Sequence, residues 1–151
     1  MTAPMSIGTP AEMESLGRRL AATLNPGDIL LLNGSLGAGK TLLISGIAQA
    51  LGVEVQVTSP TFLVVREYDG ILPLTHVDVY RLASTAEFAD LELVEASADG
   101  VLAIEWGSAV RSALPPDVLT IDIKVEEGDM RSVTFQGEGE WDIARLAELT
   151  T

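Results

Sequence analysis

The sequence predicts an α/β fold in which helices cover both faces of a mixed, mostly parallel central sheet. Three observations support this prediction. The apolar run 29–32 leads through a glycine-rich turn into a helical pattern at 42–48. A second apolar run, 101–104, follows a glycine and ends in an acid. Short turns at 69–70 and 127–129 join two pairs of β-prone segments, whose strands must then be antiparallel.

The start of the chain shows one clear helix signal. Residues 1–8 carry no pattern and are expected to form a flexible tail. Thr9 can cap a helix, Pro10 suits its first turn, and Glu12 completes a capping box. Apolar residues follow at helical spacing until the Asn-Pro-Gly-Asp turn at 25–28, which leads into the first strand.

The middle of the chain alternates β-prone and helical segments. Residues 62–68 and 72–80 are expected to form a hairpin around Asp69-Gly70. Residues 84–97 open with a capping signal and predict one or two short helices. Residues 101–106 then predict a buried strand.

The last third predicts a second hairpin and a closing helix. A short helix is expected at 108–113, stopped by Pro115-Pro116. Strands at 118–125 and 132–135 flank the turn that makes the hairpin. Residues 141–149 have helical spacing.

The composition predicts a single domain over residues 9–151. Apolar residues make up 47% and charged residues 21%, as in ordinary globular proteins. A net charge of −13 argues against the chain holding nucleic acid by itself, because phosphate contacts need a basic face. The absence of cysteine excludes a disulfide partner, and the single histidine excludes a multi-histidine metal site. Neither a membrane-spanning run nor a signal peptide is visible, so a cytoplasmic location is expected.

The stretch 34–41 has the pattern G-x-x-x-x-G-K-T of a phosphate-binding loop, or Walker A motif. Its glycines let backbone N–H groups approach a phosphate, and the following helix start adds further donors. Lys40 is expected to contact the outer phosphates, and the Thr41 hydroxyl can bind magnesium. The predicted fold is therefore a three-layer P-loop NTPase sandwich. The cofactor-binding residues expected in the loop are Gly34, Leu36, Gly37, Ala38, Gly39, Lys40, Thr41 and Leu42.

Two acids stand at the ends of predicted strands. Glu105 follows four apolar residues, the Walker-B arrangement that delivers a carboxylate to magnesium. Asp78 alternates with Val77 and Val79 and so faces the opposite way. Either acid can orient an attacking water, and the pattern does not choose between them; exposed strand-end acids would give the same pattern. His76 shares the face of Asp78, where a lone histidine is usually structural.

Three further features each allow a structural and a functional interpretation. Trp106 is more often core than functional on composition alone. Arg81 can offset phosphate charge or form an ordinary salt bridge. The Ser-Pro-Thr segment 59–61 can sense a γ-phosphate or form a rigid turn, and the Thr61 hydroxyl is the expected direct contact.

Together these motifs resemble the TsaE (YjeE-type) family, small bacterial ATPases of threonylcarbamoyl-adenosine synthesis on tRNA. The resemblance runs from about residue 9 to residue 116. The motifs that carry it are LGAGKT at 36–41, TSPTF at 58–62, HVDVYRL at 76–82 and IEWG at 104–107.

The resemblance implies a single P-loop domain that uses ATP and Mg²⁺. It implies that the protein acts together with TsaD and TsaB, which transfer a threonylcarbamoyl group to the adenosine beside the anticodon. ATP binding and hydrolysis would reset the TsaB–TsaD complex, and tRNA would be contacted only indirectly through the partners.

The family motifs also imply roles for single residues. Thr41 and Glu105 would hold magnesium, with Asp78 close by, and the catalytic set would be Lys40, Asp78 and Glu105. The remaining implied nucleotide contacts are residues 37–42 around the phosphates, the switch-like segment 59–61, Trp106, and Thr9 and Pro10 beside the adenine.

This sequence departs from the family at two loop positions. The family commonly has an acid where Ser35 stands and a second Thr or Ser at Leu42. Neither change removes a phosphate donor, because the backbone N–H of Leu42 remains.

Two other functions remain open. One is a small kinase for a metabolite or nucleoside; such kinases usually have an arginine-rich lid, whereas the arginines here are scattered. The other is a nucleotide-gated adaptor without significant turnover.

Overall fold

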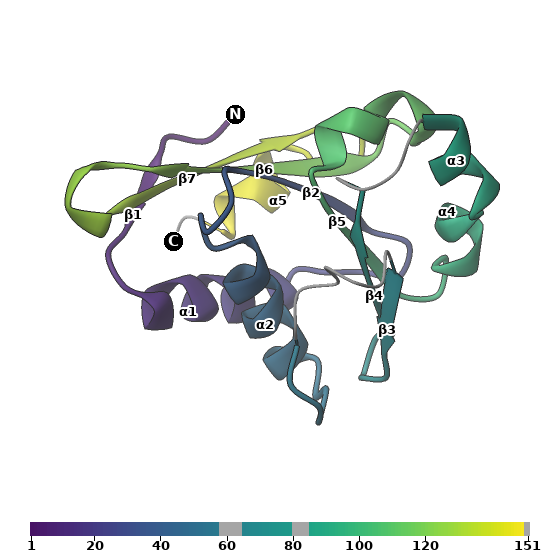
Figure 1. Cartoon of the computed structure of the whole chain (residues 1–151), viewed down its shortest axis with the longest axis horizontal. Helices are drawn as coiled ribbons and strands as arrows, with labels where there is room; N and C mark the ends of the chain where they lie inside the picture. Colours follow the sequence, from purple (N-terminus) through teal and green to yellow (C-terminus); the bar gives the residue numbers. More distant parts are fainter. Residues whose placement is uncertain (58–64, 80–84, 150–151) are drawn as a thin grey trace.

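The computed structural model describes residues 1–57, 65–79 and 85–149 of the chain. In these ranges, seven strands form one sheet with helices on both of its faces (Figure 1). The strands are β1 (Met5–Ile7), β2 (Ile29–Asn33), β3 (Val65–Tyr68), β4 (Leu74–Asp78), β5 (Val101–Glu105), β6 (Val118–Val125) and β7 (Arg131–Gly137). The helices are α1 (Pro10–Ala21), α2 (Lys40–Ala50), α3 (Thr85–Asp90), α4 (Leu93–Ala96) and α5 (Ile143–Ala147), with 3₁₀ turns η1 (Gly107–Ala113) and η2 (Glu127–Asp129).

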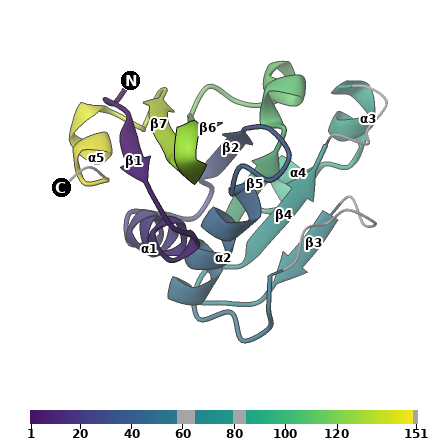
Figure 2. The same cartoon turned by 60° about the vertical axis from the view of Figure 1, so that its left-hand side comes forward.

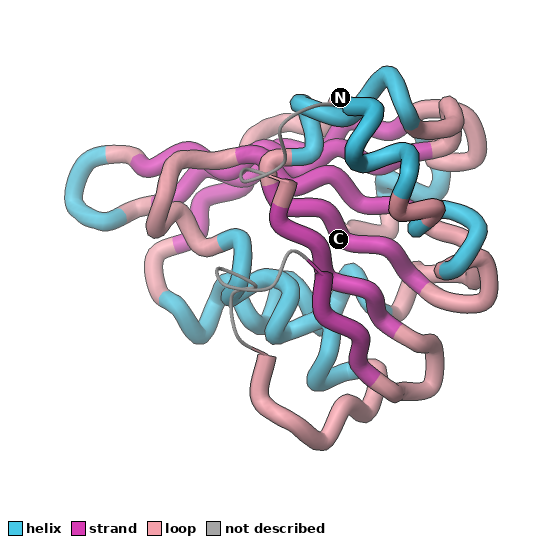
Figure 3. Tube along the Cα trace, turned by 45° about the vertical axis from the view of Figure 1, so that its right-hand side comes forward, coloured by secondary structure: helices cyan, strands magenta, loops and turns pink. Residues whose placement is uncertain are grey.

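The strand order is β1-β7-β6-β2-β5-β4-β3. The four central strands β6, β2, β5 and β4 are parallel, which brings their carboxyl ends to one end of the sheet. Figure 3 shows the strands lying side by side with helices around them. The expected mixed sheet is confirmed. "Mostly parallel" fits only this centre, because the β3–β4 hairpin, the β6–β7 hairpin and the β1–β7 pair are antiparallel and make up three of the six pairings.

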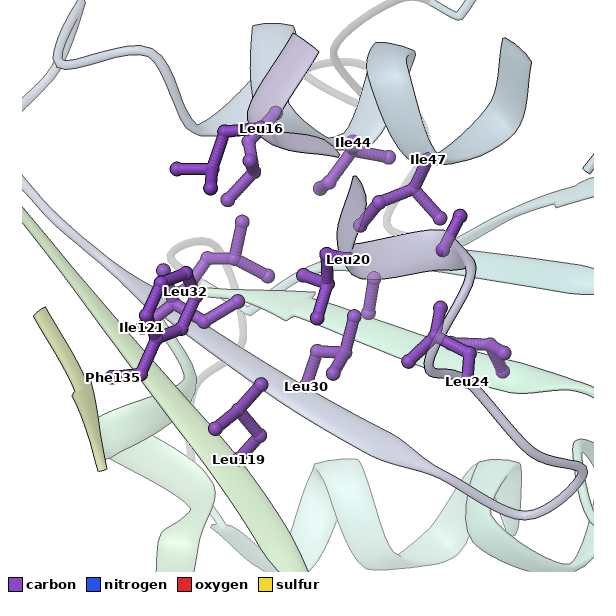
Figure 4. Packing of buried hydrophobic residues seen from close by; sticks show 14 of the residues in the cluster. Leu16, Leu20, Leu24, Leu30, Leu32, Ile44, Ile47, Leu119, Ile121 and Phe135 are labelled. Carbon is purple, nitrogen blue, oxygen red and sulfur yellow. The ribbon is translucent and has the colours of Figure 1, made fainter. Parts of the chain in front are cut away.

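Alternation along the buried strands builds two hydrophobic cores, one on each face. On β2, Leu30 and Leu32 face the core under α1, α2 and α5, and Ile29 and Leu31 face the core under α3, α4 and η1. Figure 4 shows Leu30 and Leu32 on the sheet side of the first core, with Leu16 and Ile44 of the two helices above them. Figure 2 shows α1 and α2 together on that face. The result is the expected order of layers: helix, sheet, helix.

Helices α1 and α2 touch backbone to backbone. A Cβ atom at Gly46 would lie 2.0 Å from the carbonyl oxygen of Glu14, and one at Gly17 would lie 2.2 Å from that of Leu43. Both distances are far inside van der Waals contact, so only glycine fits either position. The start of α1 is thereby fixed relative to the start of α2.

The elements at the two ends of the chain differ from expectation. A flexible tail was expected over residues 1–8, but β1 pairs with β7, and Ile7 enters the first core. Three residues are too few to show a period, so backbone pairing with a distant strand decides this segment. The helix expected at 141–149 is shorter, and its Asp142 cap accepts a hydrogen bond from Arg145 N.

Within the described residues, the predicted interior elements are otherwise present, and residues 62–64, 80 and 84 of these predictions lie outside them. The helix expected at 108–113 is the 3₁₀ turn η1. The capping box at α1 is confirmed, with Glu12 N donating to Thr9 Oγ1 at 3.1 Å. None of the helices in the described ranges has the length and hydropathy needed to cross a membrane.

Candidate functional site

The glycine-rich turn lies between β2 and α2, at the edge where the parallel strands end. Gly37 (φ +80°) and Gly39 (φ +116°) adopt the left-handed conformation, which favours glycine. At Gly39 a Cβ atom would also lie 3.1 Å from the Met13 side chain. Gly39 is the N-cap of α2 and provides no side-chain cap, so the first N–H groups of that helix are available to a ligand. This strand–turn–helix context is the one that the motif requires.

Lys40 folds back over its own loop. Its Nζ donates to the carbonyl oxygen of Gly34 at 2.5 Å and lies 3.7 Å from the centre of the Trp106 ring. Burial lowers the pKa of the Lys40 ammonium, and the nearby carboxylates of Glu105 and Asp78 act against that change. The ammonium group is therefore partly desolvated, contacts a carbonyl and an aromatic face, and lies within the electrostatic influence of two acids.

Trp106 has a positive φ of +63°, which is rare for a bulky residue. Its backbone N–H donates to Leu32 O at 2.8 Å, which anchors the turn that follows β5. The ring is half-buried against the second core. Trp106 thus packs against the core and also contacts Lys40, and its role in nucleotide binding stays a prediction.

Glu105 is the meeting point of three elements. The hydroxyl of Thr41, at the start of α2, donates to Glu105 Oε2 at 3.2 Å. His76, on β4, places its Nε2 2.5 Å from the same oxygen. The exposed fractions of His76 and Glu105 are 0% and 4%, so both groups are shielded from water. This carboxylate is therefore fixed by two side chains that are distant from it in the sequence.

Asp78 lies beside Glu105, because these residues are partners in the parallel β4–β5 register. Val77 and Val79 enter the second core, so alternation turns Asp78 toward the α2 face as expected. Two carboxylates and the Thr41 hydroxyl thus come together at the end of the phosphate loop.

A pocket of about 260 Å³ opens beside the loop. The start of α1 forms one wall through Thr9 and Pro10. The tip of the β6–β7 hairpin forms another, and its Arg131 donates from Nε to the carbonyl oxygen of Ala38 at 3.0 Å. The residues around the pocket are Gly8, Thr9, Pro10, Met13, Gly37, Ala38, Gly39, Leu42, Asp129 and Arg131.

Arg131 and Asp129 were not found from the sequence. They belong to no motif and are separated from the loop by about 90 residues of chain. Only the hairpin's antiparallel return along β6 brings them to Ala38.

One residue expected to bind the nucleotide does not line the pocket, and others lie outside the described residues. Leu36 is 89% exposed at the loop and does not line the pocket. Thr61 and the switch-like segment 59–61 lie outside the described residues, as does Arg81.

The side chains at the end of the loop fit a magnesium ion that is bound together with nucleotide phosphates. The described ranges contain no group of three or more His, Cys, Asp or Glu side chains that could hold a metal by themselves. Magnesium usually takes one or two carboxylates and completes its shell with phosphate oxygens and waters. Thr41, Glu105 and Asp78 match that donor set.

Comparisons with known proteins agree with one another. The family model "Threonylcarbamoyl adenosine biosynthesis protein TsaE" matches residues 7–133. A Bacillus subtilis protein called "tRNA threonylcarbamoyladenosine biosynthesis protein TsaE" is 43% identical over 132 residues, covering 86% of this chain and 82% of the relative. The Streptomyces coelicolor protein of that name is 42% identical over 146 residues, covering 91% and 99%. The crystal structure of Bacillus subtilis YdiB matches with a TM-score of 0.81 at 34% identity, covering 98% of this chain and 93% of that one.

Proposed function

The chain belongs to the TsaE family of threonylcarbamoyl adenosine biosynthesis proteins, and from this premise we propose that it is a magnesium-dependent ATPase of tRNA modification. The family places the chain in tRNA threonylcarbamoyladenosine biosynthesis. The observation that carries the ATPase proposal is the Thr41–Glu105 hydrogen bond at the end of the glycine loop. A hydroxyl and a carboxylate joined at the start of α2 are the protein groups that P-loop NTPases use to hold magnesium.

ATP would occupy the loop and the adjoining pocket. Backbone N–H groups of residues 37–42 and the start of α2 would bind the phosphates. Lys40 would exchange its contact with Gly34 O for phosphate oxygens. The pocket beside Thr9 and Pro10 would take the adenosine part.

Magnesium would be held by Thr41 and Glu105, with Asp78 close by. When bound, it neutralises charge that develops on the phosphates during transfer. The oxygen Oε2 of Glu105 already accepts a bond from Thr41 and faces His76 Nε2. Asp78 lies next to it in register, and one of these two acids would orient the attacking water. Lys40 would stabilise the same developing charge from the other side of the loop.

The partners would be TsaD and TsaB, and hydrolysis would reset their complex between rounds of transfer. The net charge of −13 fits a protein that leaves tRNA to its partners, because contact with many tRNA phosphates needs a basic face. Turnover by the isolated chain is expected to be slow and to rise when the partners are present.

The test is a reconstitution of tRNA modification from TsaB, TsaD and the carbamoyl-adenylate donor, with and without this chain. We expect repeated rounds of modification only when the chain and ATP are both present. Labelled γ-phosphate should appear as inorganic phosphate. Transfer of the label to an acceptor would identify a kinase instead, and nucleotide-dependent binding without phosphate release would identify an adaptor.

A further inference from the structure

His76 is a buried polar residue that the proposed hydrolysis does not use directly. It lies on β4, one of the central parallel strands, and is 0% exposed. Its Nε2 is 2.5 Å from Glu105 Oε2. Its other nitrogen, Nδ1, is buried and has no hydrogen-bond partner in the described part of the chain.

The direction of this contact follows from the chemistry of the two groups. An ionised carboxylate only accepts hydrogen bonds, so Nε2 carries the hydrogen that joins them. Nδ1 has no such partner among the described residues. The bond to Glu105 is therefore the polar contact, within that part of the chain, that offsets the cost of removing this ring from water. A residue needed only to fill the core would satisfy the same position with an apolar side chain.

We propose that His76 is a positioning residue that holds the Glu105 carboxylate in place for magnesium. Without His76, that carboxylate would keep the hydrogen bond from the Thr41 hydroxyl at 3.2 Å and would lose the contact from β4. A second group that orients a metal ligand typically contributes about 10- to 100-fold to metal affinity. This inference rests on the proposed function, since it assigns magnesium to Glu105.

The chain offers a direct test of the contact without any ligand. His76 is the only histidine, so its ring gives a single set of nitrogen signals in NMR. We expect the Nε2–H signal to shift and to exchange faster with solvent in Glu105→Ala. An unchanged ring signal in a folded Glu105→Ala protein would overturn the proposal.

The functional test uses two amide substitutions. A glutamine amide nitrogen reaches about where Nε2 lies, whereas an asparagine amide is shorter and reaches about where Nδ1 lies. Magnesium affinity is measured by titrating the metal into protein saturated with nucleotide, and nucleotide affinity is measured separately in EDTA. We expect His76→Asn to lower magnesium affinity about 10- to 100-fold and His76→Gln to retain it within about threefold.

Val77→Ala is the matched control, because Val77 is fully buried on the same strand but faces the other core. It should lose thermal stability and keep wild-type magnesium affinity. Equal magnesium affinity in folded His76→Asn and wild type, or equal loss in both amide variants, would overturn the positioning role. If the wild-type protein itself showed no magnesium-dependent nucleotide binding, the proposed function would fail first, and the NMR test would still decide whether His76 holds Glu105.

Discussion

Thr41 and Glu105 are 64 residues apart in the sequence, and a hydrogen bond of 3.2 Å joins their side chains. Thr41 begins α2, and Glu105 ends β5, which pairs with the strand that precedes the loop. The phosphate loop and its acid are therefore fixed to adjacent strands of one sheet. Any change at either side chain should be visible first as a change in the response to magnesium.

Glu105→Gln should lower ATP turnover by about 100-fold or more, because charge stabilisation through a metal is worth several kcal/mol. Its nucleotide affinity in EDTA should stay near wild type, since the loop is untouched. Turnover and binding are measured with and without magnesium. Glu54→Gln, an exposed acid, is the control. Full magnesium-dependent turnover by Glu105→Gln would remove this residue from the site.

Lys40→Ala should abolish ATP turnover and weaken ATP binding, because the cation that would contact the phosphates is lost. The measurement is nucleotide affinity by calorimetry alongside phosphate release. Lys124, the other lysine in the sequence, is exposed, so Lys124→Ala should behave like wild type. If Lys40→Ala hydrolysed ATP at the wild-type rate, the loop would not be the catalytic centre.

Stability of the protein free of nucleotide and metal should depend on Lys40 at alkaline pH. Burial lowers the pKa of this residue in the folded state below the ordinary lysine value of 10.5. In the window between the folded pKa and 10.5, the unfolded chain binds more protons, so the Lys40 contribution to stability rises with pH. Denaturant unfolding across this range should show a steeper rise for wild type than for Lys40→Met. Parallel curves for the two proteins would contradict the lowered pKa.

Arg131→Ala should weaken ATP binding about tenfold, because hydrogen bonds to a charged group contribute about 1.5–3 kcal/mol. The substitution frees the hairpin tip from the Ala38 carbonyl and opens one wall of the pocket. Arg111→Ala removes an arginine whose ion pair with Glu138 lies at the surface, and it should leave affinity unchanged. Equal affinities in the two variants would show that the hairpin does not contribute to the pocket.

Gly46→Ala should destabilise the protein by about 1–3 kcal/mol, the usual effect of overpacking. In an exposed helix the same change would stabilise by roughly 0.5–1 kcal/mol, so the sign itself is diagnostic. The reason is the Glu14 carbonyl, 2.0 Å from the position of the new Cβ atom. Urea unfolding gives the free energy, and Ala50→Gly, at an exposed position of α2, calibrates helix propensity. A stabilised Gly46→Ala protein would refute the close crossing.

The elements of this fold could be predicted where a local pattern exists. The loop, the strand ending in Glu105 and the α1 cap have short-range signals, and all three are present. β1 has no such signal, because three residues paired with a distant strand show no period. The family match also reaches residue 133, beyond residue 116 where the resemblance was expected to end, and so takes in the hairpin tip.

The sequence pattern predicts single residues of the candidate site, but it does not predict which of their side chains touch. Alternation placed His76 and Asp78 on one face, but it could not show that His76 would reach Glu105. That contact depends on the register between β4 and β5, which side-chain pattern alone does not fix. Arg131 lies near the loop for a similar reason, through the register of β6 and β7.

The strand order has a consequence for how the chain meets other proteins. The two edge strands are β1 with three residues and β3 with four, and both are joined to the sheet by antiparallel pairing. Such short edges give few unpaired backbone groups for strand addition, and β3 also carries the charged pair Arg66 and Glu67. Aggregation through these edges of the described sheet is therefore disfavoured, which favours contacts with other proteins through its helices and loops.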